Sequence, residues 1–348
     1  MNILALIILG LMLYNIEIKK NHEYLSLQST TCINGIFIIL VFYRHIAQYV
    51  KFNGPWDGAM NYVNANIHQL LVVPFLFYSG YGIMQSILKR DSYVKGLPTK
   101  RIIRVLIHFM IAVSSYLALG IALGKKYPIK QVLLSFIGWE SLGNSNWYIF
   151  CILFMYLFTW IGFTVFSKRK NVALVVVTVL SIAFIIILGN YKDGYWFNTV
   201  MAYPLGMWIG YYKKQIDKIV LDNTVVWVLC LVGCAVLSHF AYQEMGRGIW
   251  RYQFMAICFA LLLMLITMRV SIKNQALFFL GKGLFGFYMM QRFPMSLFAH
   301  LGLAKESKYV YVVVCAIATI VIGCVFNYLI KYVDNLIFSS KSKKELSH

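Results

Sequence analysis

The chain is 348 residues long; 60% of its residues are hydrophobic and only 13% are charged. Because soluble domains carry about 25% charged residues, this composition excludes a water-soluble globular protein. The formal net charge of +20 would indicate nucleic acid or another acidic partner in a soluble chain. The cysteines lie in apolar runs without CxxC pairs or Cys/His ligand spacing, so we expect neither disulfides nor a metal site.

Eleven apolar runs, bounded by charges or turn residues, follow one another along the chain. A helix needs about 20 apolar residues to cross a hydrocarbon core of about 30 Å, and these runs are too evenly apolar for barrel strands. The sequence therefore predicts an all-α fold, a polytopic integral membrane helical bundle of about ten core transmembrane helices plus one extra N-terminal helix. The runs are 1–16, 31–50, 68–88, 102–123, 147–166, 172–190, 195–212, 224–241, 250–268, 276–300 and 309–336.

The first run could also belong to a cleaved secretory signal. It has no basic region before it and no small-residue cleavage site after it, and Lys19 and Lys20 follow instead. We therefore expect segment 1–28 to be an uncleaved N-terminal helix with a cytoplasmic linker. Because the run is short for a crossing, an interfacial or tilted helix is the alternative.

The basic residues divide unequally when the runs are threaded alternately through a membrane. With Lys19 and Lys20 inside, the inner segments carry 20 Lys and Arg and the outer segments carry nine. The positive-inside rule then predicts a multi-pass protein of the bacterial plasma membrane, with its N-terminus outside and a basic tail, 339–348, in the cytoplasm. This topology signal and attraction to anionic lipid together account for much of the charge, so membrane lipids and no nucleic acid are the expected partners.

Of the 32 Lys and Arg, the count of inner and outer segments leaves three unassigned, Arg44, Lys282 and Arg292, which we place within the membrane spans. An intramembrane cation costs about 3 kcal/mol and usually faces a polar cavity. Lys282 is near the end of its run and is expected to snorkel to the surface. For Arg44 and Arg292 we predict a polar cavity with a bound anion or polar substrate, and a structural ion pair or carbonyl contact is the alternative.

Two segments carry a recognisable pattern, and the first of them ends in a histidine. Residues 35–45 read GIFIILVFYRH, in which Gly35 begins an apolar stretch that ends in His45, and residues 75–83 read FLFYSGYGI. These segments resemble the first core helix and the FF-x-x-SG-aromatic segment of the membrane acyltransferase 3 family. Its members include O-acyltransferases that modify bacterial surface polysaccharides.

Further segments follow in the same order as in that family. KRIIRVL (100–106) is similar to its cytoplasmic RxxR, NWYIFCILFMYL (146–157) to its W-aromatic helix, and FLGKGLFGFYMMQRFP (279–294) to its LGxxSYxxYxxHxP segment. The chain departs from the pattern at Asn34, where the family usually has Arg or Lys, and at Leu284 and Gln291, which replace its Ser and His. The resemblance covers 29–338, which we take as a membrane acyltransferase-3-like domain.

The resemblance implies acyl transfer from cytoplasmic acyl-CoA, with acetyl-CoA as the expected donor. The acceptor would be a hydroxyl of an envelope, capsular or exopolysaccharide glycan or of a lipid-linked sugar. Imidazole suits removal of a hydroxyl proton at neutral pH, so His45 is the expected general base. Arg supplies forked donors to phosphate, so Arg101 and Arg104 are expected to bind the CoA, with positioning at the membrane surface as the alternative. The residues expected to contact substrate or the oxyanion are Arg44, Ser79, Trp147, Tyr288, Gln291 and Arg292.

Two other classes of protein also fit many spans with buried cations. One is a polysaccharide flippase, polymerase or secondary transporter, although no self-similar halves are evident. The other is an anchoring subunit without catalysis, which would not need His45 or the paired arginines. The predicted outer loops 51–68 and 123–146 leave little room for a further domain. Their aromatics Trp56, Tyr62 and Trp139 either stack on sugar rings or form an interfacial belt.

Overall fold

The computed structural model describes residues 1–345, and within them the chain is almost entirely helical. Two three-residue strands, β1 (Ile16–Ile18) and β2 (Val270–Ile272), pair antiparallel. The predicted all-α fold is therefore confirmed. The helices are α1 (Asn2–Leu13), α2 (Leu27–Ile46), α3 (Gly58–Ile67), α4 (Val73–Lys89), α5 (Tyr93–Leu97), α6 (Arg104–Ala122), α7 (Ile129–Phe136), α8 (Trp147–Val165), α9 (Lys170–Leu188), α10 (Ala202–Tyr211), α11 (Lys213–Ile216), α12 (Thr224–Glu244), α13 (Ile249–Thr267), α14 (Gln275–Lys282), α15 (Leu284–Met290), α16 (Arg292–His300), α17 (Leu303–Glu306) and α18 (Lys308–Glu345).

Eight helical stretches within residues 1–345 are long and apolar enough to cross a membrane, which confirms a polytopic bundle. The predicted runs 1–16, 195–212 and 276–300 instead form shorter helices. At about 1.5 Å per residue, the 12 residues of α1 cover about 18 Å, which is less than a full crossing. The eight stretches are Leu27–Ile46, Gly58–Lys89, Tyr93–Ala122, Trp147–Val165, Lys170–Leu188, Thr224–Arg247, Ile249–Thr267 and Lys308–Phe338.

The run 276–300 is broken into α14, α15 and α16. At the first break, the side chain of Asn327 on α18 donates to the Gly283 carbonyl at 3.1 Å and accepts from the Gly286 amide at 3.2 Å. A broken helix inside a membrane protein needs such partners, because lipid offers none to the freed backbone groups.

Glycines allow two pairs of helices to pack with their backbones in close contact. A Cβ at Gly35 of α2 would lie 2.0 Å from the Leu277 carbonyl oxygen of α14. A Cβ at Gly80 of α4 would lie 2.1 Å from the Tyr203 carbonyl oxygen of α10. Small residues commonly bring membrane helices together in this way. Gly35 of the GIFIILVFYRH segment and Gly80 of the FLFYSGYGI segment thus have a packing role.

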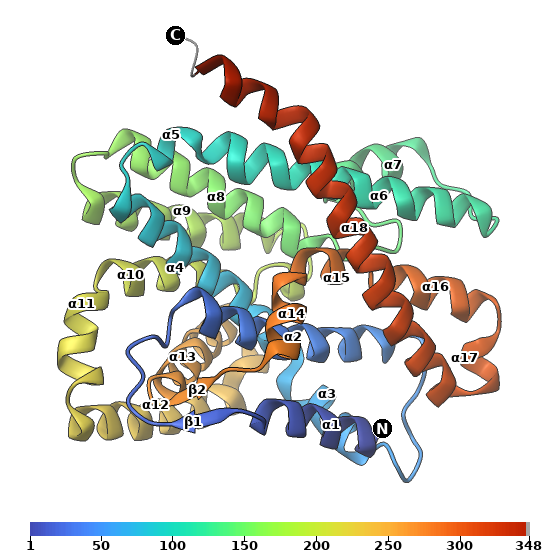
Figure 1. Ribbon diagram of the computed structural model, residues 1–348, viewed down its shortest axis with the longest axis horizontal. Coiled ribbons are helices and arrows are strands. Elements are labelled where there is room, and N and C mark those ends of the chain that lie inside the picture. Colours follow the sequence, from blue (N-terminus) through green and yellow to red (C-terminus); the bar gives the residue numbers. More distant parts are fainter. Residues whose placement is uncertain (346–348) are drawn as a thin grey trace.

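The loops gather at two ends of the bundle (Figure 1). At one end, here called the strand end, β1 and β2 lie with α5 and α11, and Lys20 pairs with Asp222 at 2.7 Å. The other end contains a polar cavity around His45 and is here called the cavity end. There Lys308 pairs with Asp57 at 2.6 Å. In the predicted alternate threading, the two loops joined by each ion pair lie on the same side of the membrane. The assignment of the strand end to the cytoplasm stays a prediction.

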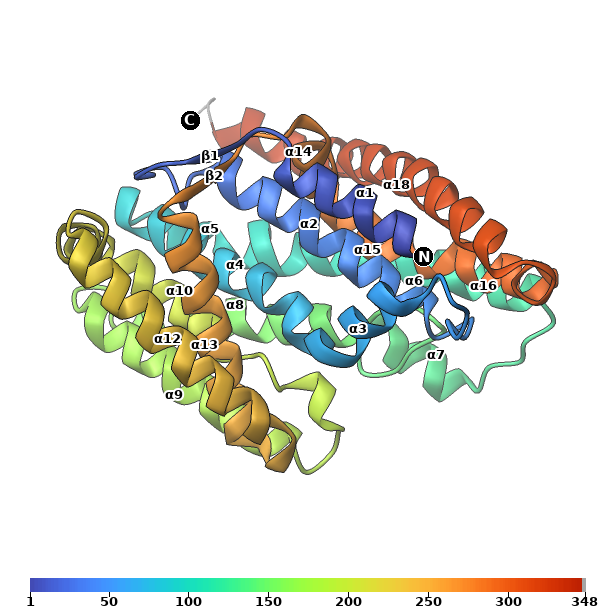
Figure 2. The same ribbon diagram turned by 90° about the horizontal axis from the view of Figure 1, so that it is seen from below.

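The long helix α18 and the group α9, α12 and α13 lie on different sides of the bundle (Figure 2). α12 exposes large apolar side chains along its length, which is typical of a helix that faces lipid. The C-terminal half of α2 lies inside the bundle, beside α15 and α4. This arrangement surrounds the last turn of α2 with polar loops and broken helices.

Candidate active site

A polar cavity of about 490 Å³ lies at the cavity end, around the last turn of α2. It brings together five residues that the sequence singled out: Arg44, His45, Trp147, Tyr288 and Arg292. These come from α2, the start of α8, α15 and α16, segments far apart in the chain. The volume lies in the usual range for small-molecule sites.

His45 is 91% buried and lines this cavity. Its Nδ1 is buried and has no hydrogen-bond partner among the described residues. The His45 ring lies 6.2 Å from the Tyr288 ring, centroid to centroid. The imidazole therefore packs near Tyr288, and the hydrogen-bonding capacity of its Nδ1 is unused within the described residues.

Two guanidinium groups give the cavity its charge. Arg292 donates to Gln48 Oε1 at 2.5 Å, while its Nε is buried without a partner within residues 1–345. Arg44 lines the cavity next to His45. No Asp or Glu is among the described residues that line it. The site is therefore suited to an anion or a developing negative charge.

Several polar residues of the cavity were not predicted from the sequence, namely Gln48, His68, Gln69, Asn144 and Ser145. His68 stands at the junction of α3 with a short 3₁₀ turn and has a φ of 46°, which is strained for a residue with a Cβ. Such strain is often found at functional sites. The NSNW sequence before α8 was the available signal for Asn144 and Ser145.

Buried polar atoms without partners converge on this cavity. Within the described residues, the side-chain atoms in question are His45 Nδ1, Gln69 Oε1, Asn144 Nδ2, Ser145 Oγ, Tyr288 Oη and Arg292 Nε. Most buried polar groups in folded proteins are hydrogen-bonded. Their common location therefore indicates that a polar ligand or water occupies the cavity.

The loop of residues 138–147 forms one wall of the cavity. Asn146 Nδ2 donates to the carbonyls of Gly138, at 2.8 Å, and Glu140, at 3.0 Å. Gly138 and Gly143 have positive φ values of 82° and 109°, which favour glycine. These contacts fix the loop and hold Trp147 at the first position of α8.

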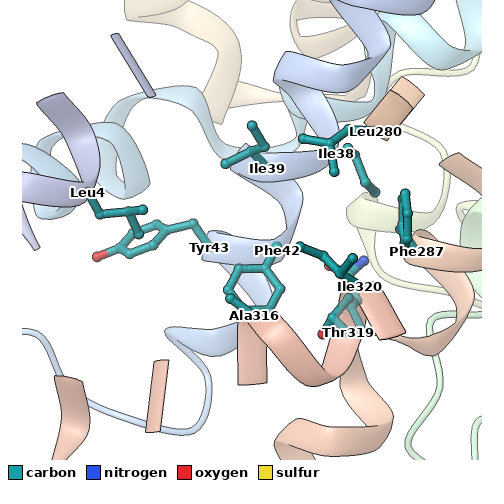
Figure 3. A pocket seen from close by; sticks show the side chains of 11 residues that line it. Leu4, Ile38, Ile39, Phe42, Tyr43, Leu280, Phe287, Ala316, Thr319 and Ile320 are labelled. Atoms are coloured by element: carbon teal, nitrogen blue, oxygen red, sulfur yellow. The ribbon is translucent and has the colours of Figure 1, made fainter. Parts of the chain in front are cut away.

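Two predicted site residues lie away from this cavity. Ser79 Oγ is 2.8 Å from Tyr156 Oη, in a contact between α4 and α8. Gln291 is fully buried beside a separate apolar cavity of about 140 Å³ between α1, α2, α14, α15 and α18 (Figure 3). Its Nε2 donates to the Tyr288 carbonyl at 3.2 Å.

Arg101 and Arg104 lie at the strand end but have different neighbours. Arg101 Nε donates to Tyr93 Oη at 3.1 Å, whereas Arg104 Nε lies 3.4 Å from an oxygen of Asp334 on α18. His108 Nε2 contacts the same Asp334 oxygen at 2.9 Å. A π-helical turn, Pro98–Ile103, precedes Arg104 and widens the helix between the two arginines. The two guanidinium groups therefore contact different elements, Arg101 the start of α5 and Arg104 the helix α18.

A small apolar cavity of about 100 Å³ lies between the arginines and the His45 cavity. Val105, which follows Arg104, lines it, as do Tyr148 and Tyr156. Tyr288 lines both this cavity and the one around His45. Among the side chains that the structure describes, no group of three or more His, Cys, Asp and Glu could hold a metal ion.

Comparison with known proteins agrees with the motifs. A family model described as an acyltransferase domain matches residues 31–329, which is most of the chain. No curated protein and no solved structure shows significant similarity to it. The match spans the segments that carry His45, the paired arginines and the broken helix. The chain belongs to the acyltransferase 3 family, and the protein is a membrane acyltransferase.

Proposed function

We propose that the protein transfers an acyl group, with acetyl as the expected group, from cytoplasmic acyl-CoA to a hydroxyl of an envelope glycan. The observation that carries the proposal is the cavity around His45, where unpartnered buried polar atoms meet two arginines without a carboxylate among the described lining residues. A cavity of this kind fits a polar acceptor and a reaction that develops negative charge on oxygen.

His45 acts as the general base. Its imidazole takes the proton of the acceptor hydroxyl as the oxygen attacks the thioester carbonyl, and a new carbon–oxygen bond forms. The carbon–sulfur bond then breaks, the acyl ester is complete, and the imidazolium returns the proton to the leaving thiolate. General-base catalysis of this kind contributes about 10² to 10⁴ in rate.

The tetrahedral intermediate carries its negative charge on the former carbonyl oxygen. Arg292 Nε and Tyr288 Oη are buried donors without partners in the described part of the chain, and both border the cavity of His45. Donors that are already in place stabilise such an oxyanion without reorganisation. Arg44 adds positive charge from the neighbouring position of α2.

The donor enters from the strand end. Arg101 and Arg104 bind the phosphates of CoA there, because guanidinium groups form strong charge-assisted hydrogen bonds with phosphate oxygens. The apolar cavity lined by Val105, Tyr156 and Tyr288 supports a path for the acyl arm toward His45. The glycan reaches the same histidine from the cavity end.

The test is the substitution His45→Ala in a deletion strain. We expect the O-acetyl content of the surface glycan, measured by NMR at matched membrane levels, to fall at least a hundredfold. His239→Ala is the matched control, because His239 is an exposed histidine in the membrane-spanning stretch Thr224–Arg247, away from the cavity. Acylation by His45→Ala within about twofold of wild type would contradict the mechanism and favour a transporter.

A further inference from the structure

A second polar cleft, of about 440 Å³, opens beside the His45 cavity. It lies between the 138–147 loop and the segment 189–196 that follows α9. Ser141, Asn146 and Tyr195 line both hollows. The two volumes are therefore neighbouring compartments that meet at these three residues.

We propose that this cleft is a saccharide-binding subsite that holds the sugar unit next to the one acylated at His45. The inference rests on the proposed function and specifies its acceptor, which is an oligosaccharide or polysaccharide of at least two units. Each compartment has the volume of an ordinary small-molecule site, so each accommodates a sugar ring.

The cleft offers the side chains that bind sugars. Glu140 and Asp193 provide carboxylate oxygens that accept hydrogen bonds from hydroxyls. Tyr195 is 43% exposed at the boundary of the two compartments, and its aromatic face is available to the apolar face of a sugar ring.

The tryptophans of the cleft have a different role. Lys192 Nζ lies 4.2 Å from the centre of the Trp139 ring and 4.7 Å from that of Trp196, and it donates to the Trp139 carbonyl at 2.9 Å. The ammonium thus covers these rings and ties the two loops together. Tyr195, rather than Trp139, is therefore the stacking residue.

The two compartments differ in the charged residues that line them. The cleft has two carboxylates, Glu140 and Asp193, and one ammonium, Lys192, whereas arginines dominate the cavity of His45. Lys192 already pairs with Glu140 at 3.6 Å. The cleft therefore favours a neutral, hydroxyl-rich unit over an anionic one, and the reacting end of the glycan lies with the arginines.

The experiment uses the full-length protein in lipid nanodiscs with labelled acetyl-CoA. The acceptors are single-sugar and longer fragments from partial hydrolysis of the producing cell's own surface glycan. We expect the wild type to have a lower KM for the longer fragments. In Tyr195→Ala, the KM for these fragments rises about tenfold, the scale of one lost aromatic contact, and Tyr195→Phe restores it. Asp193→Asn weakens the same preference by removing a charged acceptor.

Trp56→Ala and Tyr62→Ala are the matched controls. These aromatics are 64% and 71% exposed and line neither compartment. Equal use of single-sugar and longer fragments by the wild type, or an unchanged preference in both Tyr195→Ala and Asp193→Asn, overturns the subsite. Loss of the preference for longer fragments in Trp56→Ala and Tyr62→Ala also overturns the subsite. A wild type that acylates no fragment of either kind overturns the proposed function itself, and the subsite with it.

Discussion

The buried carboxylate of Asp57 is expected to anchor the cavity end, and removing its charge should destabilise the protein. Asp57 has no exposed surface. It accepts hydrogen bonds from Lys308 Nζ at 2.6 Å, the Gly54 amide at 3.0 Å and Tyr309 Oη at 3.2 Å. The carboxylate thus joins the 51–57 loop to the first residues of α18.

In Asp57→Asn, the charge is lost and Lys308 keeps an unpaired ammonium. Breaking a buried pair by removing one partner costs about 3 to 5 kcal/mol. The Lys308 side chain is 23% exposed and can reach water, so the lower end of this range applies. At about 2 cal/mol/K of unfolding entropy per residue, 3 kcal/mol corresponds to a fall in Tm of about 4 °C.

The pH dependence gives a second readout of the same interaction. Burial alone would raise the pKa of Asp57, but the hydrogen bonds from Lys308 and Gly54 outweigh it and hold the pKa below its ordinary value. A carboxyl whose pKa is lowered in the folded state stabilises the fold above its unfolded pKa of about 3.9. This stabilisation is lost as the pH falls through the folded-state pKa. The Tm of the wild type should therefore fall more steeply with acid than that of Asp57→Asn.

The assay is thermal unfolding in detergent, followed by tryptophan fluorescence between about pH 7 and pH 3. Glu244→Gln is the control, because Glu244 pairs only with the exposed side chains of Arg247 and Arg251 in the described part of the chain. Such surface pairs contribute about 1 kcal/mol or less. A Tm for Asp57→Asn equal to that of Glu244→Gln at neutral pH would refute the assigned role of Asp57.

Three further predictions concern the donor site, the helix packing and the topology. Arg101→Ala combined with Arg104→Ala should raise the KM for acyl-CoA at least tenfold without loss of membrane insertion, and an unchanged donor KM would leave these residues only a positioning role. Gly35→Leu should lower the folded yield in detergent, because its side chain meets the α14 backbone; a normal yield would contradict that close approach. Cysteine labelling should find Ser167 on the cytoplasmic side and Asn53 outside, and finding both on one side would exclude the predicted threading.

The helices were predictable because apolar length is a local property, but the breaks within them were not. Residues 276–300 form a single apolar run in the sequence. Gly281, Gly283 and Gly286 were a local signal that the run is weak as a helix. Asn327, whose side chain forms hydrogen bonds with the backbone groups freed at the break, lies 41 positions beyond Gly286 on α18. No spacing rule relates the two, because only the tertiary packing brings them together.

The candidate site was predictable where a charged or titratable side chain interrupts an apolar run. Arg44 and Arg292 were found in this way, because placing such groups in lipid is costly, whereas His45 was found because its segment resembles the family pattern. Neutral polar residues in loops carry no such penalty. Asn144 and Ser145 were therefore not predicted from the sequence, although the fold places both at the cavity that His45 lines.

Adjacent residues on a helix point about 100° apart, so the sequence alone does not show which of two neighbours faces a cavity. The structure gives a different answer at the pair 291–292 than at the pair 44–45. Gln291 faces the apolar cavity between α2 and α18, whereas Arg292 faces the cavity of His45. Arg44 and His45 both reach one cavity, since that cavity surrounds the last turn of α2. The family pattern places a histidine at Gln291, yet here it is Arg292, a cation, that lines the cavity together with His45. The positive charge of the His45 cavity therefore depends on which face of the broken helix each residue occupies, and the order of residues in the motif does not determine it.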